Sequence, residues 1–322
     1  MTKIYLATKL FSFFDRLVSV QMYNAISNTE SLREADIYLP FKDSNMKVSN
    51  DGNVAYNIFI ADIKNLQNAD IFICRLDGLS FDAGVGFELG FCFAMNIPTF
   101  VFTTDYVDSK LDDRKFFISP ITDKVSYCFK YEYQYQKQWE YEKELIYNSE
   151  RFSAFVQNKF SNGLFRNKYS FCPDIKDGSI DIFIDICGCH YEWNQFVISE
   201  ILEKLGSMKI TYWISNRYCP DYSFQDDINA LCSCKLVLIC LDENEPNLDS
   251  CILQGIAYFQ GKEIIGYESN KVLYYLKDKQ QMGVNLMVEQ ACSYIASSLE
   301  EVINLIKEKL IVQVEKNEAE KN

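Results

Sequence analysis

The segment Asp82-Ala83-Gly84-Val85-Gly86-Phe87-Glu88-Leu89-Gly90 combines carboxylates with glycines in a pattern that suits a ligand site. It follows a predicted buried strand and opens a predicted helix, and ligands of open parallel sheets bind outside the carboxyl ends of the strands. Gly84 and Gly86 would let the backbone turn tightly and approach a ligand. We expect Glu88 in the first helical turn, directed at the crevice. The helix dipole alone also favours a glutamate there, and the third glycine of a dinucleotide fingerprint is missing.

The net charge and the histidine count exclude several classes of partner and of active site. The chain has 322 residues, with 32 Lys+Arg, 45 Asp+Glu and a net charge of −13, which argues against nucleic acid or anionic membranes as partners. The chain has one histidine, so a Ser-His-Asp triad would have to use His190. A zinc site with several histidine ligands is excluded. We therefore expect carboxylates, tyrosines or cysteines to move protons.

The twelve cysteines include no Cys-x-x-Cys pair, and many lie in apolar runs. The start of the chain has no secretory pattern and no apolar run reaches the ~18 residues of a membrane span, so we expect a cytoplasmic protein with reduced thiols. The cluster Cys187-Gly188-Cys189-His190 is too crowded for usual zinc spacing. We interpret it as a strand-to-helix turn, with a metal site as the alternative.

Short apolar runs alternate with amphipathic stretches in the first part of the chain. This alternation predicts an α/β fold with a parallel sheet covered on both faces and right-handed crossovers. The predicted strands are Ile4–Ala7, Ile37–Pro40, Ile71–Leu76 and Thr99–Phe102, and the predicted helices are Phe13–Ile26, Val54–Leu66 and Phe87–Met95.

Residues 128–178 differ, because tyrosines and Trp139 crowd a stretch that is rich in Lys, Glu and Gln. We interpret this segment as a linking helix, from about Gln136 to Phe160, followed by a loop. The aromatic residues could stack nucleobases, but core or interface packing is their commoner use. The predicted organisation is a first domain at 1–127, the linker at 128–178, a second domain at 179–314 and a charged tail at 315–322.

The order of elements starts again after the linker and predicts an internal repeat. Asp62-Ile63-x-x-Leu66, Leu76-Asp77 and Gly90 align without a gap to Asp227-Ile228-x-x-Leu231, Leu241-Asp242 and Gly255. Identity at turn and loop positions favours duplication over chance similarity. The predicted elements are strands Ile180–Ile186, Lys209–Trp213, Lys235–Leu241 and Glu263–Gly266, and helices Trp193–Leu205, Phe224–Leu231, one ending at Gln260, and Ala296–Leu310.

Four segments in order resemble the nucleoside 2-deoxyribosyltransferase family, over about residues 3–105. They are Lys3-Ile4-Tyr5-Leu6-Ala7 with Leu10-Phe11-Ser12, then Asp62-Ile63-x-x-Leu66-x-x-Ala69-Asp70, then Leu76-Asp77-Gly78, and the segment from Asp82 to Gly90. The resemblance implies two tandem flavodoxin/Rossmann-like, doubly wound parallel-sheet domains that form a pseudo-dimer. It also implies deoxynucleosides and free nucleobases as partners, nucleotide salvage as the role, and no cofactor or metal.

The resemblance implies roles for single residues. Glu88 matches the nucleophile that forms a covalent deoxyribosyl-enzyme, and Tyr5 matches the tyrosine that orients it. Asp62 matches the acid that protonates the departing base, and Asp82 matches the residue that holds the 5′-hydroxyl. Further substrate-binding residues are expected at Gly84, Gly86, Phe11, Asp77 and Asn285.

The chain also departs from the family pattern. Thr8-Lys9 replaces the usual Gly-Pro, and the cation of Lys9 leaves room for a phosphorylated substrate. The alternatives to base exchange are hydrolysis of a nucleoside or nucleotide, including NAD cleavage or nucleotide depletion, and a non-catalytic nucleotide sensor.

In the second half, Leu253 stands at the position of Glu88, so this half is expected to be inactive. Asn285-Leu286-Met287-Val288-Glu289 resembles a family motif whose asparagine completes a neighbouring subunit's pocket. We therefore hypothesise a fused pseudo-dimer with one site per chain, completed by Asn285, with a further homo-oligomer possible. The alternative role for Asn285 is to cap a helix.

Overall fold

The chain forms two compact units, Met1–Phe171 and Cys172–Asn322, in a computed structural model. Each unit is described by itself. The residues that the structure describes are 1–10, 12–43, 54–77, 81–105, 109–111, 114–132, 140–161, 171, 173, 180–186, 192–217, 219, 221–241, 247–268, 274–275, 281–282 and 285–312.

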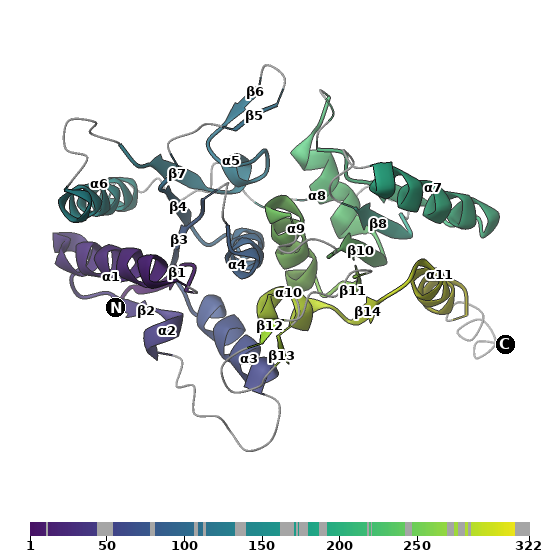
Figure 1. Ribbon diagram of the computed structural model, residues 1–322, viewed down its shortest axis with the longest axis horizontal. Helices are drawn as coiled ribbons and strands as arrows, with labels where there is room; N and C mark the ends of the chain where they lie inside the picture. The colour runs from purple at the N-terminus through teal and green to yellow at the C-terminus, as the bar shows by residue number, and fades with distance from the viewer. Residues whose placement is uncertain are drawn as a thin grey trace. The chain divides into compact units, whose positions relative to one another are not determined.

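The first unit is built on a parallel sheet of five strands, in the order β2-β1-β3-β4-β7 (Figure 1). In this doubly wound order, successive strands are added on one side of β1 and then on the other, and ligands of such sheets bind at the carboxyl ends of the strands where the order reverses. The strands are β1 (Lys3–Ala7), β2 (Asp36–Tyr38), β3 (Ile71–Arg75), β4 (Thr99–Thr103) and β7 (Tyr127–Lys130).

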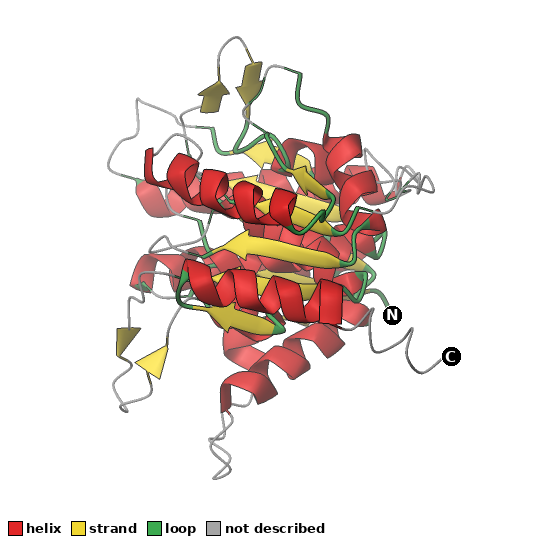
Figure 2. Ribbon diagram, turned by 90° about the vertical axis from the view of Figure 1, so that its right-hand side faces the viewer, coloured by secondary structure: helices red, strands yellow, loops and turns green. Residues whose placement is uncertain are grey.

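Helices cover both faces of this sheet; Figure 2 draws the helices of the chain in red and its strands in yellow. Alternate side chains of β1 serve the two faces: Ile4 and Leu6 join the core under α1 (Phe13–Asn28) and α6 (Tyr141–Ser161). Tyr5 reaches the other face, where it bonds Glu88 of α4 (Ala83–Ala94), the helix that packs beside α3 (Val54–Gln67). Shorter elements are η1 (Glu30–Leu32), α2 (Pro40–Asp43), α5 (Thr122–Val125) and a hairpin of β5 (Ser109–Leu111) and β6 (Arg114–Phe116).

The second unit has another five-stranded parallel sheet, in the order β14-β11-β10-β8-β9. Its strands are β8 (Ile182–Asp185), β9 (Tyr212–Ile214), β10 (Leu236–Cys240), β11 (Glu263–Tyr267) and β14 (Tyr294–Ala296). One core forms under α7 (Glu192–Ser207) and α11 (Leu299–Lys307). The remaining elements are α8 (Phe224–Ser233), α9 (Leu248–Phe259), α10 (Leu286–Ala291), a hairpin of β12 (Tyr274–Tyr275) and β13 (Gln281–Met282), and a π-helical turn at Glu308–Val312.

The two sheets have one topology. Counted along the chain, each places its strands in the order second, first, third, fourth, fifth. Strand β3 and helix α4 recur as β10 and α9 with the same lengths, each 165 residues later. The expected α/β class with two tandem parallel-sheet domains is therefore confirmed, whereas gene duplication and a pseudo-dimeric arrangement stay predictions.

The structure corrects three expectations about elements. The fifth strand of each sheet, β7 and β14, was not expected, because both are short and have exposed or half-buried residues. Most of the segment expected as a linker belongs to the first unit, because Phe152 and Val156 of α6 lie in its core and α6 packs against α1. Helix α4 begins at Ala83 rather than Phe87, because Asp82 caps it.

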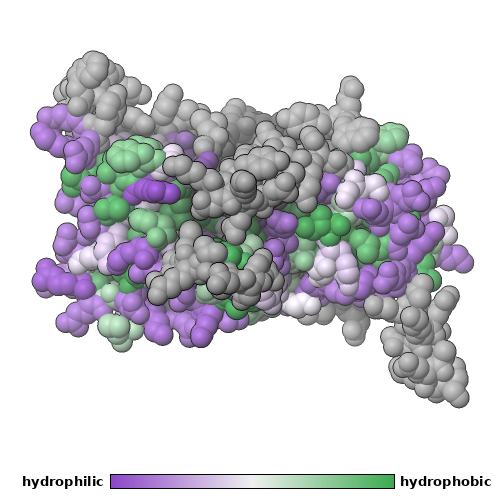
Figure 3. Space-filling model, turned by 60° about the horizontal axis from the view of Figure 1, so that its bottom comes forward, coloured by the Kyte–Doolittle hydropathy of each residue, from purple (hydrophilic) through white to green (hydrophobic). Residues whose placement is uncertain are grey.

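Within the described residues, none of the helices combines the length and apolarity that a membrane crossing requires. On the face drawn in Figure 3, hydrophilic and hydrophobic residues are interspersed.

Candidate active site

Tyr5 and Glu88 form a buried hydrogen-bonded pair at the first sheet. The Tyr5 hydroxyl, at the middle of β1, donates to Oε1 of Glu88 over 2.6 Å. Glu88 lies in the second turn of α4, not in its first turn as expected, since the helix begins five residues earlier. Both side chains are buried, with exposed fractions of 0% for Tyr5 and 5% for Glu88. A phenol that donates to one oxygen leaves the carboxylate in a fixed orientation.

Asp62 of α3 is the second buried carboxylate of this site. Its Oδ1 accepts a hydrogen bond of 2.9 Å from the Tyr38 hydroxyl at the end of β2. Tyr38 and Tyr5 are register partners in neighbouring strands, and their ring centroids lie 5.2 Å apart. The site is therefore two carboxylates from two helices, each bonded to a phenol from a strand.

Burial and mutual repulsion disfavour charge on both carboxylates. Burial raises the pKa of Asp62 to about 6, while hydrogen bonds from Tyr38 and Tyr5 oppose the increase. Burial also raises the pKa of Glu88 well above its usual value; the nearby charge of Asp62 adds to this, and the bond from Tyr5 opposes it. Mutual repulsion in one buried site favours a state in which one of the two carboxyl groups is protonated. The pair can thus supply one acid and one nucleophile at the same time.

Asp82 lies at the N-cap of α4. Its Oδ1 accepts from the backbone N–H of Gly84 over 2.9 Å and of Val85 over 3.4 Å. Gly84 and Gly86 are buried residues of the first helical turns rather than of a loop. Asp82 therefore starts the helix that carries Glu88, besides any role toward a substrate.

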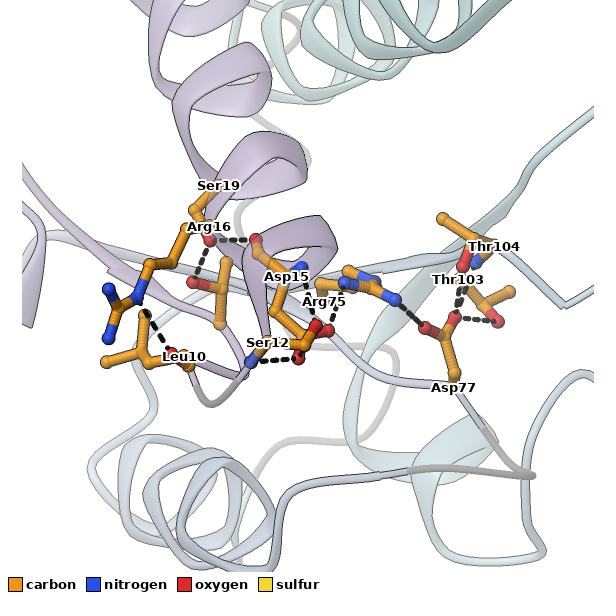
Figure 4. Close-up of polar contacts among 10 residues, drawn as sticks. Leu10, Ser12, Asp15, Arg16, Ser19, Arg75, Asp77, Thr103 and Thr104 are labelled. Carbon is orange, nitrogen blue, oxygen red and sulfur yellow. Dashed lines mark hydrogen bonds and ion pairs between the residues drawn. The ribbon is translucent and has the colours of Figure 1, made fainter. Parts of the chain in front are cut away.

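A buried arginine links the first turn of α1 to the loops that follow β3 and β4, as Figure 4 shows. Arg75, at the end of β3, donates from Nη1 to Oδ1 of Asp15 over 3.0 Å and from Nε to Oδ2 of Asp77 over 2.8 Å. The other oxygen of Asp77 accepts from the backbone N–H of Thr104 over 2.6 Å and from its hydroxyl over 2.9 Å. The first turn of α1 and the loops that follow β3 and β4 are thus linked, directly or through Asp77, to one guanidinium.

Asp77 was expected to bind the substrate. In the structure its carboxylate bonds Arg75 and Thr104 of the protein itself. Asp15 belongs to the same network and to the capping box of α1 with Ser12. Burial raises the pKa of Asp15, but hydrogen bonds from Ser12 and the charge of Arg75 outweigh this and hold the pKa below its usual value.

The structure brings Tyr5, Asp62 and Glu88 together as the sequence predicts, and it adds residues that the sequence analysis missed. Tyr38 could have been found only from the pairing of β2 with β1, which puts it beside Tyr5. Arg75 and Asp15 could have been noticed as opposite charges near the ends of an apolar strand and the start of a helix. Phe11 lies outside the described residues, and Lys9 is half-buried in the loop after β1.

The corresponding place in the second unit has neither the tyrosine nor the glutamate of the first. Strand register puts Phe183 where Tyr5 stands, and Leu253 of α9 takes the place of Glu88. Asp227 of α8 remains, and it accepts from Trp213 Nε1 over 2.8 Å and from Ser215 Oγ over 2.6 Å. The expected inactivity of this half stays a prediction, and these substitutions support it.

A buried arginine lies near Asp227, and its charge lowers the pKa of this aspartate. Arg217, 1% exposed, donates to Asp185 over 2.8 Å, to Ser215 over 3.1 Å and to Ser250 over 2.7 Å. Its Nε lies 3.7 Å from a carboxylate oxygen of Asp249.

Asn285 caps α10, because its Oδ1 accepts from the N–H of Met287 over 3.0 Å. This geometry matches the alternative role that the sequence left open. Its expected contribution to a substrate pocket stays a prediction.

Among the described residues, His, Cys, Asp and Glu side chains form no group of three or more that is arranged to hold a metal ion. The cluster Cys187-Gly188-Cys189-His190 lies outside those residues.

Comparison with known proteins gives one family. Residues 4–139 match the family model described as nucleoside 2-deoxyribosyltransferase. A conserved protein from Enterococcus faecalis V583 is 32% identical over 35% of this chain and 70% of its own, with a TM-score of 0.30. A 2-deoxyribosyltransferase from Bacillus psychrosaccharolyticus is 17% identical over 44% of this chain and 96% of its own, with a TM-score of 0.31. Among curated proteins, the chain has no match.

Proposed function

Because the chain belongs, through residues 4–139, to the nucleoside 2-deoxyribosyltransferase family, we propose that its first unit transfers 2-deoxyribose between nucleobases by double displacement at Glu88. The observation that carries this proposal is the 2.6 Å bond from the Tyr5 hydroxyl to the buried Glu88 carboxylate, with the Asp62 carboxylate beside it. A nucleophile that is oriented by one group and paired with a separate acid is the minimum that this reaction needs.

In the first half-reaction, a carboxylate oxygen of Glu88 attacks the anomeric carbon of the deoxyribose. The bond from that carbon to the base nitrogen breaks, and its electron pair leaves with the base. Asp62 protonates the base as it departs. A carboxylate suits the nucleophile, because the transition state is oxocarbenium-like and carries positive charge.

In the second half-reaction, a nitrogen of the incoming base attacks the anomeric carbon and gives its proton to Asp62. The ester bond to Glu88 breaks, and its electron pair returns to the carboxylate. One residue thus acts as acid and then as base, which is most efficient when its pKa lies near the working pH. The pKa of Asp62, about 6 because of burial, meets that requirement.

We further propose that Asp82 binds the 5′-hydroxyl and selects nucleosides over nucleotides. A buried carboxylate repels a 5′-phosphate through the like charge. Lys9, in the loop after β1, is the cation that would reduce this selectivity.

The test is base exchange with purified full-length protein. Thymidine is incubated with and without adenine, and the products are separated by chromatography. Deoxyadenosine that forms only with adenine supports transfer. Free thymine and deoxyribose formed without adenine would replace the proposal by hydrolysis, which uses the same Glu88. An unchanged rate in Glu88→Ala would refute an enzymatic role for this site.

A further inference from the structure

We propose that Tyr38 is a positioning residue of this site, which holds the Asp62 carboxylate in place for proton transfer to and from the nucleobase. The proposal rests on the proposed function and deepens it, because it adds a fourth residue to the machinery of Tyr5, Asp62 and Glu88.

The first argument is geometric. Tyr38 ends β2, the edge strand beside β1, and its hydroxyl lies 2.9 Å from Oδ1 of Asp62. Tyr38 is half-buried, whereas Asp62 is 5% exposed, so the phenol approaches the carboxylate from the more open side. Tyr38 thus bonds the acid, whereas Tyr5 bonds the nucleophile and by a further hydrogen bond also lowers the pKa of the acid. These donors orient two mutually repelling carboxyl groups.

The second argument comes from the other sheet. Trp213 is the register partner of Phe183 in β9 and β8, as Tyr38 is of Tyr5 in β2 and β1. Its indole N–H donates to Oδ1 of Asp227 over 2.8 Å. The second unit therefore keeps a donor from the edge strand on this aspartate, although Phe183 and Leu253 have removed the Tyr5–Glu88 pair. The contact does not depend on the nucleophile.

The two aspartates differ in how firmly they are held. Asp227 accepts from Trp213 on Oδ1 and from Ser215 on Oδ2, so both of its oxygens are engaged. Asp62 accepts from Tyr38 on Oδ1, and a hydrogen bond from Tyr5 also lowers its pKa. The cation of Arg217 further favours ionised Asp227, whereas the charge near Asp62 is the like charge of Glu88, which favours protonated Asp62. Proton exchange is what the reaction demands of Asp62.

Among the described residues, the charged and titratable groups that act on Asp62 are Tyr38 from β2, Tyr5 from β1 and Glu88 from α4. Asp43 of α2 acts on Tyr38 in turn, where burial and the charge of Asp62 raise the phenol's pKa. Removal of the Tyr38 hydroxyl takes away a bond that favours ionised Asp62, so the pKa of Asp62 must increase. Base departure needs protonated Asp62, and the decline of its rate at high pH therefore moves to higher pH.

The experiment compares Tyr38→Phe with Tyr56→Phe in the full-length protein. Tyr56 is a control from the same helix as Asp62, and it is 46% exposed. Exchange kinetics are measured from pH 5 to pH 9. For Tyr38→Phe we expect kcat at pH 6 to fall about tenfold, with KM changed less than about twofold, and the high-pH decline to shift upward by roughly one unit. Tyr56→Phe should match the wild type.

A second measurement does not require activity. Carboxyl ¹³C NMR follows the titration of Asp62, which is assigned by its loss in Asp62→Asn. An upward shift of this titration in Tyr38→Phe supports the proposal. An unchanged titration, or a lower kcat with an unmoved pH profile, overturns it and leaves Tyr38 a structural residue. Absence of any exchange in the wild type refutes the proposed function instead, whatever the titration shows.

Discussion

The two units use one sheet topology for two different polar clusters. In the first unit, Glu88 and Asp62 lie together with phenols as partners, and among the described residues neither forms an ion pair. In the second unit, the remaining carboxylates surround Arg217, which is almost fully buried. The second cluster pairs its carboxylates with a cation, whereas the first pairs its carboxylates with phenols. The comparison teaches that one fold can hold its buried carboxylates at the carboxyl ends of the strands either with phenols or with an arginine.

The largest expected effect is a loss of exchange activity that occurs when the first unit is changed but not when the second unit is changed. Glu88→Gln keeps the size of the side chain but removes the nucleophile, so exchange should fall at least about 10³-fold. The matched change in the second unit is Leu253→Met, a substitution of similar volume that should leave the rate within about twofold. Initial rates of deoxyadenosine formation measure both. Equal losses in the two variants would contradict the assignment of one catalytic unit.

The next effect separates the units by stability. Arg217→Met leaves Asp185 and Asp249 buried without their cation, which should cost about 3–5 kcal/mol of unfolding free energy. Scanning calorimetry should show one transition moved down while the exchange rate per folded molecule is kept. A loss of exchange at temperatures where the protein is fully folded would show that the second cluster serves catalysis.

The pH dependence of stability gives a third contrast. Burial raises the pKa of Asp62 from 3.8 to about 6. A raised carboxyl pKa contributes stability that is complete below about pH 4 and is lost as the pH increases through 6. Asp62→Asn should therefore be similar to the wild type at pH 4 and more stable at pH 8, by ~2–3 kcal/mol, which corresponds to roughly 5 °C in Tm.

Thermal unfolding at both pH values checks this prediction. If Asp62→Asn were equally destabilised at pH 4 and pH 8, burial of the ionised Asp62 carboxylate would not lower the stability of the wild type. The prediction makes Asp62 an example of a functional group that lowers the stability of its own domain.

The smallest effect concerns Asp82. Asparagine is as good an N-cap as aspartate, so Asp82→Asn should keep α4 intact while it removes one negative charge. Circular dichroism should be unchanged. The ratio of kcat/KM for thymidine to that for its 5′-monophosphate should fall about tenfold. An unchanged ratio would leave Asp82 with only the capping role that its bonds to Gly84 and Val85 show.

The sequence predicted the fold class, because this depends on local patterns, and a family resemblance pointed to Tyr5, Asp62 and Glu88. Alternation of apolar runs with helical periodicity fixes β1, β3, α3 and α4, and their order brings Tyr5, Asp62 and Glu88 to one place. The start of α4 was wrong by four residues, because two glycines favour a loop in a sequence pattern while the cap by Asp82 decides the structure.

The missed residues depend on contacts between segments that are distant in the chain. Tyr38 acts through the register of β2 against β1, and Arg75 acts through Asp15, sixty residues earlier. Neither relation leaves a periodic signal. The edge strands β7 and β14 were missed for a related reason, since their pairing with β4 and β11 defines them more than their own residues do.

The Arg75 network makes the first turn of α1 and the loops after β3 and β4 energetically interdependent. Asp15, Asp77 and Thr104 share one guanidinium directly or through one carboxylate, so a change at one alters the partners of the others. Substitutions there should be non-additive, with coupling free energies of about 0.5–3 kcal/mol in double-mutant cycles. The loss of stability from a mutation at one of these residues therefore depends on which residues stand at the other two. This dependence restricts the order in which substitutions around Arg75 can accumulate during evolution.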